Sequence, residues 1–226
     1  MPSANMNLMK ANRKYHIFNR GNNRENIFPT DADKGKFNSK MESYLPKIAH
    51  VFTCAILDNH FHYVVQIEIT KQILKLIKKD KKLQKFVQNL PPPDKYKNKK
   101  SYIVSRVLSE VLRCCFIGYA MYFNKKYDRT GAVFSKSFKR KEIRDEKYLR
   151  DCIIYVNRNI TNHFPDIDFR RYKWCWYWKF LNPKYIASLK GTFFDFEGLF
   201  GDIDNFIYLH ERKDTLVNKQ KFILEK

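Results

Sequence analysis

The sequence VFTCAILDNHFHYVVQI, residues 51–67, decides the fold because two runs of strand-forming residues flank a turn. Residues 51–57 are rich in β-branched and aromatic side chains, which favour a strand. Asp58 and Asn59 form a turn pair, and residues 61–67 continue as a second apolar run. The stretch therefore predicts a β-hairpin.

The segments on either side of this hairpin complete the order of elements. Residues 14–20, KYHIFNR, alternate as a strand does, and residues 31–50 carry apolar side chains at helical spacing. Further along, we expect a long helix over 101–123, a strand over 132–141 and a helix from its cap Asp145 to about residue 159. This β-α-β-β-α-β order predicts an α+β fold of the ferredoxin-like (split βαβ) type. Helices pack on its antiparallel sheet, and one helix follows the fourth strand.

The chain is expected to form one domain over residues 1–180, followed by a C-terminal extension of unassigned role over 181–226. A Lys/Pro-rich insert interrupts the domain at about 69–100. Residues 71–100 hold 11 Lys and 2 Asp, a local charge of 11 − 2 = +9, together with three consecutive prolines. We expect a short basic helix and then a connector there. The insert either clamps a polyanion or serves only as a linker, and the sequence leaves both open.

Composition points to a folded protein with a polyanionic partner. The 226 residues are 44% hydrophobic, and 44 Lys+Arg against 23 Asp+Glu give a formal net charge of +21. The apolar content excludes a disordered basic tail, and the charge points first to nucleic acid and second to an anionic membrane. The longest apolar run, 114–123, is much shorter than the roughly 20 residues of a membrane-spanning helix. No membrane partner is therefore expected.

Cysteine and glycine usage indicates the expected cellular location and the expected cofactor class. The five cysteines show no paired spacing, which indicates reduced thiols and a cytoplasmic location. The seven glycines form neither nucleotide-binding fingerprint, so no nucleotide cofactor is expected.

His60 and His62 are the first candidate site residues. They share one face of the second hairpin strand, because strand side chains alternate, and Phe61 takes the other face. Two adjacent imidazoles can form half of a metal site, although such a pair also occurs on a hydrated or satisfied sheet face. His16, on the first strand, has no partner histidine in its own segment and is assigned to packing.

Two stripes of side chains run along the helix that begins after Asp145. The apolar stripe consists of Leu149, Ile153, Val156 and Ile160. The second consists of Tyr148, Cys152, Tyr155 and Asn159. Tyr155 is thus not needed for the apolar stripe, and Asn159, one turn along, can serve the same site. A boundary tyrosine with a hydrated hydroxyl is the alternative interpretation, and Tyr148 is the rival tyrosine.

Several motifs, taken in order, resemble the single-tyrosine transposases of the HUH endonuclease superfamily, which include the IS200-like and REP-associated tyrosine transposases. The resemblance covers residues 15 to about 177. The motifs are YHIFNRGNNR at 15–24 with Ile27 and Phe28, NHFH at 59–62, GAVF at 131–134 with Phe138 and Lys139, and YVNRN at 155–159. The departures are Asp58 and Ile160 in place of proline, Ser137 in place of arginine, and Cys175 and Trp176 in place of two serines.

The resemblance implies metal-dependent cleavage and rejoining of single-stranded DNA at hairpin-flanked sites through a 5′-phosphotyrosine intermediate. Tyr155 would be the catalytic nucleophile, and His60, His62 and Asn159 would hold Mg²⁺ or Mn²⁺. The partner would be single-stranded or hairpin DNA in a bacterial-type cytoplasm, associated with the nucleoid. A monomer and a homodimer both stay open.

Basic residues at the fourth strand and the first turn are the expected phosphate contacts. They are Arg20, Arg24, Lys136, Lys139, Arg140, Lys141 and Arg144. A non-catalytic hairpin DNA- or RNA-binding protein on the same fold is the alternative function, favoured by the replacements at Asp58 and Ser137.

Overall fold

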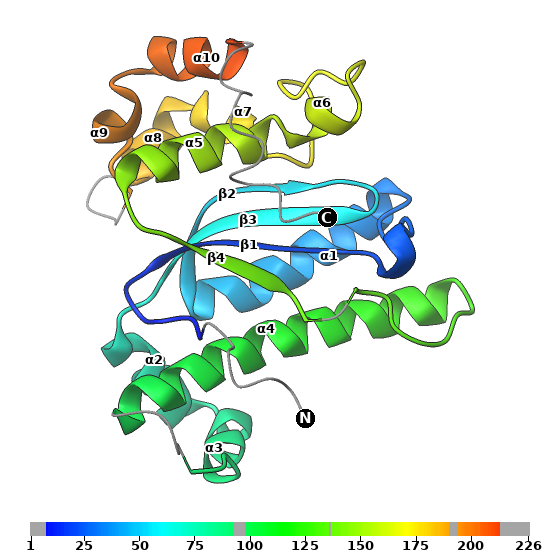
Figure 1. The fold of residues 1–226 in the computed structure, drawn as a ribbon, viewed down its shortest axis with the longest axis vertical. Coiled ribbons are helices and arrows are strands. Elements are labelled where there is room, and N and C mark those ends of the chain that lie inside the picture. The colour runs from blue at the N-terminus through cyan, green and yellow to red at the C-terminus, as the bar shows by residue number, and fades with distance from the viewer. Residues whose placement is uncertain (1–7, 93–97, 136, 190–193, 213–226) are drawn as a thin grey trace.

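The computed structural model describes residues 8–92, 98–135, 137–189 and 194–212. Figure 1 shows helices above and below one central sheet. The strands are β1 (Lys14–Arg20), β2 (Ala49–Ile56), β3 (His60–Ile67) and β4 (Lys139–Ile143). The α-helices of the first half are α1 (Asp31–Tyr44), α2 (Thr70–Lys79), α3 (Lys81–Gln88) and α4 (Lys99–Lys126). Those of the second half are α5 (Glu146–Asn157), α6 (Asn159–His163), α7 (Tyr177–Phe180), α8 (Pro183–Leu189), α9 (Phe196–Phe200) and α10 (Ile203–Glu211).

The four strands form one antiparallel sheet in the order β2-β3-β1-β4. This is the strand order of a ferredoxin-like sheet, so the predicted fold class is confirmed. The hairpin predicted at residues 51–67 is β2–β3. In the centre of the sheet, β1 pairs with β3 so that Arg20 lies opposite His60 and Phe18 opposite His62.

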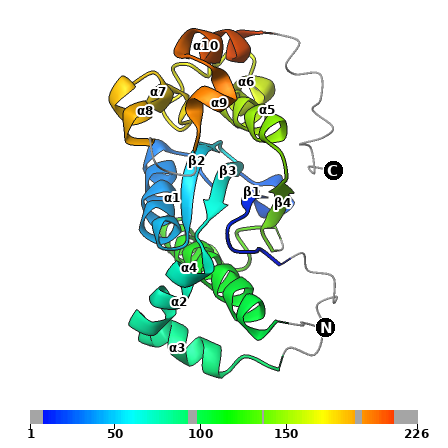
Figure 2. The same ribbon diagram turned by 90° about the vertical axis from the view of Figure 1, so that its left-hand side faces the viewer.

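The two faces of the sheet carry separate cores because the side chains of each strand alternate. Phe61 and Tyr63 belong to the core shared with α1 and α4, whereas Val64 belongs to the core shared with α5. Figure 2 shows α1 and α4 on one side of the strands and α5 with the C-terminal helices on the other. His60 and His62 alternate with Phe61 and Tyr63, so they face α5. Among the described residues, no helix has the length and apolar character that a membrane crossing needs.

Two predicted boundaries were wrong for local reasons. The first helix ends at Tyr44 rather than near residue 50, because Pro46 cannot donate to a helical hydrogen bond and a short 3-10 turn follows over Leu45–Lys47. The fourth strand covers only Lys139–Ile143, not 132–141. The preceding segment bridges the chain after β1 through Gly21 and Phe134, in a loop that begins at Gly131 with a φ of 86°.

The basic insert forms two amphipathic helices, α2 and α3, where one short helix was predicted. Ile73 and Leu83 are buried, while the lysines between them face solvent. Asp80 ends α2 and caps α3, because its side chain accepts from the backbone N–H groups of Lys82 and Leu83. Part of the predicted connector, residues 93–97, lies outside the described residues.

A buried carboxylate joins α1 to α4. Asp33 accepts hydrogen bonds from Lys126 Nζ at 2.6 Å, the Tyr127 hydroxyl at 2.6 Å and the Tyr122 hydroxyl at 3.0 Å. It also completes a capping box with Thr30 at the start of α1. Burial alone would raise the pKa of Asp33, but the hydrogen bonds from Lys126, Thr30, Tyr127 and Tyr122 lower it to about 2.

We expect Asp33→Asn to lower the free energy of unfolding by about 2 kcal/mol at pH 7, since it removes the charge that four donors stabilise. Tyr127→Phe, which removes one donor, should cost about 1 kcal/mol. Because the folded-state pKa is depressed, the contribution is present above pH 4 and is lost as the pH falls toward 2. Urea titrations at pH 7 and pH 3 measure both effects, and an Asp33→Asn variant as stable as wild type would contradict the assignment.

The C-terminal extension packs against α5. The core shared by α5 and the sheet includes Phe180 of α7 and continues into the extension through Phe196 of α9 and Phe206 of α10. α5 is thus covered by the sheet and by the C-terminal helices, and both stripes predicted for it are buried. That residues 181–226 form an extension separate from the domain stays a prediction.

A chain of buried hydrogen bonds ties α10 to the sheet through α5. His210 Nδ1 donates to the Phe206 carbonyl at 2.7 Å, so His210 Nε2 accepts from Asn157 Nδ2 at 3.0 Å. Asn157 Oδ1 in turn accepts from the Thr53 hydroxyl at 2.5 Å. Burial lowers the pKa of His210 to about 3, so the ring is neutral in the fold.

This depressed pKa predicts a pH effect on stability. Between pH 6.5 and 3 the unfolded chain binds a proton at His210 that the folded chain does not, so stability falls as the pH falls. The slope from this one group is about 1.4 kcal/mol per pH unit. Urea unfolding of wild type and His210→Gln from pH 7 to 4.5 measures it. Equal slopes in the two proteins would show that His210 is not the group responsible.

Candidate active site

The α5-facing side of β1 and β3 gathers three histidines. His60 and His62 come from β3 and His16 from β1, and all three are almost fully buried. The His16 and His62 rings stack with centroids 5.0 Å apart, and the His60 ring stands nearly perpendicular to that of His62 at 5.1 Å. The hairpin and the central strand thus build a compact imidazole cluster.

The hydrogen bonds of His60 fix its tautomer. Asn59 Nδ2 donates to the Arg24 carbonyl at 3.4 Å, which turns Asn59 Oδ1 toward His60 Nδ1 at 2.6 Å. Nδ1 therefore carries a proton, because an amide oxygen can only accept, and Nε2 presents a lone pair when the ring has no second proton. That lone pair then faces Asn159 Oδ1 at 2.9 Å, so two acceptors meet. A second proton on the ring, a reversed Asn159 amide or a cation held between the two atoms removes this conflict.

His16 has a partner that the sequence analysis did not find. Its Nε2 lies 2.8 Å from His62 Nδ1, so one ring donates a hydrogen bond to the other. If His62 ligates a metal through Nε2, its Nδ1 carries the proton and His16 Nε2 is the acceptor. The assignment of His16 to ordinary packing was therefore too simple, because the partner histidine comes from the neighbouring strand.

Tyr155 lies on α5 above the same cluster. Its ring centroid is 5.7 Å from that of His62 and 6.1 Å from that of His16, edge to face in both cases. Only 8% of Tyr155 is exposed. The rival Tyr148 lies two turns earlier, where Lys141 Nζ is 5.6 Å from the centre of its ring.

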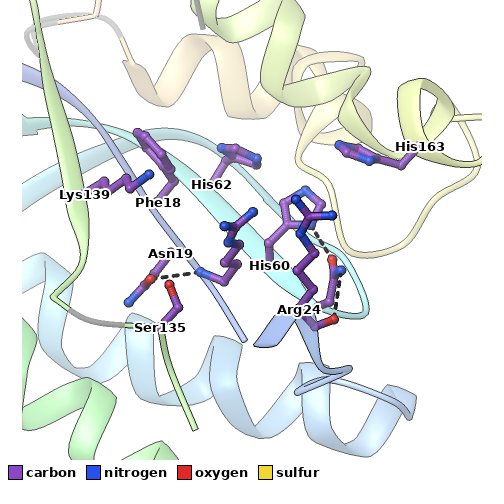
Figure 3. A pocket seen from close by; sticks show the side chains of 10 residues that line it. Phe18, Asn19, Arg24, His60, His62, Ser135, Lys139 and His163 are labelled. Carbon is purple, nitrogen blue, oxygen red and sulfur yellow. Dashed lines mark hydrogen bonds between the residues drawn. The ribbon is translucent and has the colours of Figure 1, made fainter. Parts of the chain in front are cut away.

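A cavity of about 310 Å³ opens beside the histidines. Figure 3 shows His60, Arg24 and His163 on one side of it and Phe18, His62 and Lys139 on the other. The described residues that line it are Phe18, Asn19, Arg20, Arg24, Asn59, His60, His62, Ser135, Lys139 and His163. Among them are three cationic side chains and no carboxylate, which suits a phosphate group.

The basic residues that were expected to contact phosphate do not all lie at this cavity. Arg20, Arg24 and Lys139 line the cavity. Lys141 lies against Tyr148, and Arg144 is exposed just beyond β4. Arg140 instead lines a different cavity next to α4, because successive residues of β4 point to opposite faces. Lys136 lies outside the described residues.

The cavity also holds a residue that sequence reasoning missed. His163 follows Asn159 by four residues, the spacing that places two side chains on one helix face, and its ring centroid is 4.7 Å from that of His60. Extending the helical pattern past Asn159 could have found it. Arg24, an expected phosphate contact, lies in the cavity wall on a backbone with a φ of 61°, a conformation that the sequence does not reveal.

The donor set suits a divalent cation. His60 Nε2 and Asn159 Oδ1 are as far apart as two neighbouring ligands of an octahedral metal, about 3 Å. Asn159 Nδ2 is buried and has no hydrogen-bond partner among the described residues, so no hydrogen bond from this nitrogen determines which amide atom faces His60. The described residues contain no cluster of three or more His, Cys, Asp or Glu side chains arranged to hold a metal. A metal bound by His60 and His62 would therefore need an amide oxygen such as Asn159 Oδ1 as its third protein ligand.

Comparison with known proteins adds one structural likeness. No family model matches the chain, and no curated protein matches it. A solved structure of a REP-associated tyrosine transposase bound to a REP hairpin matches with a TM-score of 0.45 and 11% sequence identity. The match covers 82% of this chain and 88% of that one. The fold class rests on the strand order and packing described above.

Proposed function

We propose that this protein cuts and rejoins single-stranded DNA through a covalent bond between Tyr155 and a 5′-phosphate, with a divalent metal at His60, His62 and Asn159. The observation that carries the proposal is the position of Tyr155. A helix that follows the fourth strand brings its phenol ring to the histidine pair of the hairpin, 5.7 Å from His62. The histidine pair lines a cavity that also carries three cationic side chains.

The reaction is a transesterification. The Tyr155 hydroxyl loses its proton and attacks phosphorus, the bond from phosphorus to the 3′-oxygen breaks, and that oxygen leaves as a 3′-hydroxyl after taking up a proton. Reversal by another 3′-hydroxyl rejoins strands, so no nucleotide cofactor is needed. A phenol in water has a pKa of about 10, so the site has to favour attack by a group that is mostly protonated at pH 7.

The residues of the cavity support this chemistry in different ways. Arg20, Arg24 and Lys139 would hold the phosphate and balance its charge. His60, His62 and Asn159 would hold Mg²⁺ or Mn²⁺, and two imidazoles favour Mn²⁺. When bound, the metal would polarise a non-bridging phosphate oxygen. His16 would orient His62 through the 2.8 Å hydrogen bond.

A covalent adduct tests the proposal directly. Wild-type protein incubated with hairpin-flanked single-stranded oligonucleotides and MnCl₂ should yield a protein band of higher mass on a denaturing gel. EDTA should prevent it. Failure to form an adduct with any oligonucleotide or divalent metal, in a protein that binds these strands, would reject the activity.

One observation favours the alternative of a non-catalytic hairpin DNA- or RNA-binding protein. Tyr155 is 8% exposed and is not among the residues that line the cavity, so its hydroxyl has to become accessible before it can attack. A pure binding protein needs only the cationic lining. Tight hairpin binding without an adduct is the result that this alternative predicts.

A further inference from the structure

A second cavity, of about 580 Å³, lies on the other face of the sheet. Its walls come from α3, α4 and the segment that joins α4 to β4, which runs back along α4 in Figure 1. Four phenylalanines line it: Phe86, Phe116, Phe134 and Phe138. The Phe116 ring centroid is 5.5 Å from those of both Phe134 and Phe138, and its plane is tilted by 56° and 55° to theirs, so the three rings form one aromatic wall with differently oriented faces.

Guanidinium groups share this cavity with the aromatic wall. Arg140 lies over the Phe138 ring, with Cζ 5.2 Å from its centroid. Arg113 is held by Glu110 through two hydrogen bonds of 2.7 Å. Arg106, by contrast, has a buried Nε that no described residue hydrogen-bonds. With three arginines against one glutamate, the lining has a net charge of 3 − 1 = +2.

The two cavities are neighbours across one short segment of chain. Asn19 of β1 lines both of them. Of the residues that precede β4, Ser135 lines the first cavity and Ser137 the second. The shared Asn19 and the two serines therefore place the aromatic wall next to the proposed phosphate position at Arg20 and Lys139.

We infer that the second cavity binds an unpaired nucleobase of the same DNA strand, stacked on Phe138 and in edge contact with the tilted Phe116 ring, with its phosphate on Arg106. An aromatic ring accepts any base through stacking, and a guanidinium pairs with phosphate through two hydrogen bonds. The volume lies within the range of small-ligand pockets, and the positive lining complements a polyanion. The inference rests on the proposed function and gives it a binding position outside the reacting centre.

The test distinguishes the contribution of base stacking to DNA affinity from the contribution of charge. Fluorescence anisotropy, with EDTA present so that no strand is cut, compares labelled (dT)₁₂ with a 12-unit abasic strand of the same charge. Phe138→Leu should weaken (dT)₁₂ binding about tenfold, the usual effect of losing one stacked base, and leave the abasic strand unaffected. Trp178→Leu, at a 49% exposed tryptophan, is the matched control and should change neither affinity.

Arg106 provides a second, independent variant. Arg106→Gln should weaken both strands equally and reduce the salt dependence of binding by about one phosphate, whereas exposed Arg171→Gln should not. Cross-linking with 5-iododeoxyuridine strands should attach at Phe116, Phe134 or Phe138. Equal loss of both strands in Phe138→Leu, or no preference for bases in wild type, overturns the inference.

These outcomes are distinguishable from failure of the proposed activity. An adduct in wild type without any Phe138-dependent base preference overturns the base pocket and leaves the activity standing. A Phe138-dependent preference without any adduct supports the pocket and favours the binding-protein alternative.

Discussion

Tyr155→Phe is expected to abolish the covalent protein–DNA adduct and to leave strand binding within about twofold of wild type. The substitution removes a single oxygen, which is the atom that would attack phosphorus, and retains the ring that contacts His16 and His62. The cationic lining of the cavity is untouched, so binding should persist. A denaturing gel measures the adduct, and anisotropy on the same strand measures affinity.

Tyr148→Phe is the matched control for this prediction. Tyr148 lies on the same helix and the same stripe and is 5% exposed, close to the 8% of Tyr155. It should form the adduct at the wild-type level, because its ring lies against Lys141. Adduct formation by Tyr155→Phe, or loss of the adduct only in Tyr148→Phe, would move the nucleophile away from Tyr155.

The fold could be predicted where local pattern and tertiary packing agree. The turn pair Asp58–Asn59 and the alternation around Phe61 gave the hairpin and the face on which His60 and His62 lie. Asp145 caps α5 as expected, since its side chain accepts from the Tyr148 N–H at 2.7 Å. These features depend only on neighbours within a few residues of one another, so a single sequence reveals them.

Other features depend on partners that are distant in the chain. His16 pairs with a residue 46 positions away, and Asn157 bonds to His210 across 53 positions. The local pattern of a single sequence does not show which distant residues will pair. The predicted fourth strand was too long for a similar reason. Residues 132–135 pair irregularly with the turn that follows β1 and do not pair along the length of β1.

The packing around α5 differs from the one that its helical pattern predicts. The pattern placed Tyr155 and Asn159 on a stripe outside the core, but this stripe faces the histidines of β1 and β3, so both residues are buried. Asn157, two residues from Tyr155, is anchored to β2 and α10 at once. The tyrosine is thus carried on a helix held on two sides, which favours a fixed orientation of the ring over the histidines.

The double substitution His60→Ala/His62→Ala is expected to eliminate Mn²⁺ binding and adduct formation together. Two of the three proposed ligands are lost, and the remaining Asn159 oxygen cannot hold the ion alone. Strand affinity without metal should change little, because Arg20, Arg24 and Lys139 remain. Mn²⁺ affinity is measured by electron paramagnetic resonance titration, which reads the metal site whether or not DNA is cut.

Two single variants accompany this prediction, one as a control and one with an intermediate expected effect. His50→Ala removes a partly exposed histidine of β2 that pairs with Glu68, and it should retain Mn²⁺ binding and the adduct. Asn59→Ala removes the acceptor that fixes the His60 tautomer, and it should weaken Mn²⁺ binding 10- to 100-fold without abolishing it. Unchanged Mn²⁺ affinity in the double variant would place the metal elsewhere. Unchanged affinity in Asn59→Ala alone would remove the tautomer argument, because His60 Nε2 would then present its lone pair to Asn159 without help from Asn59.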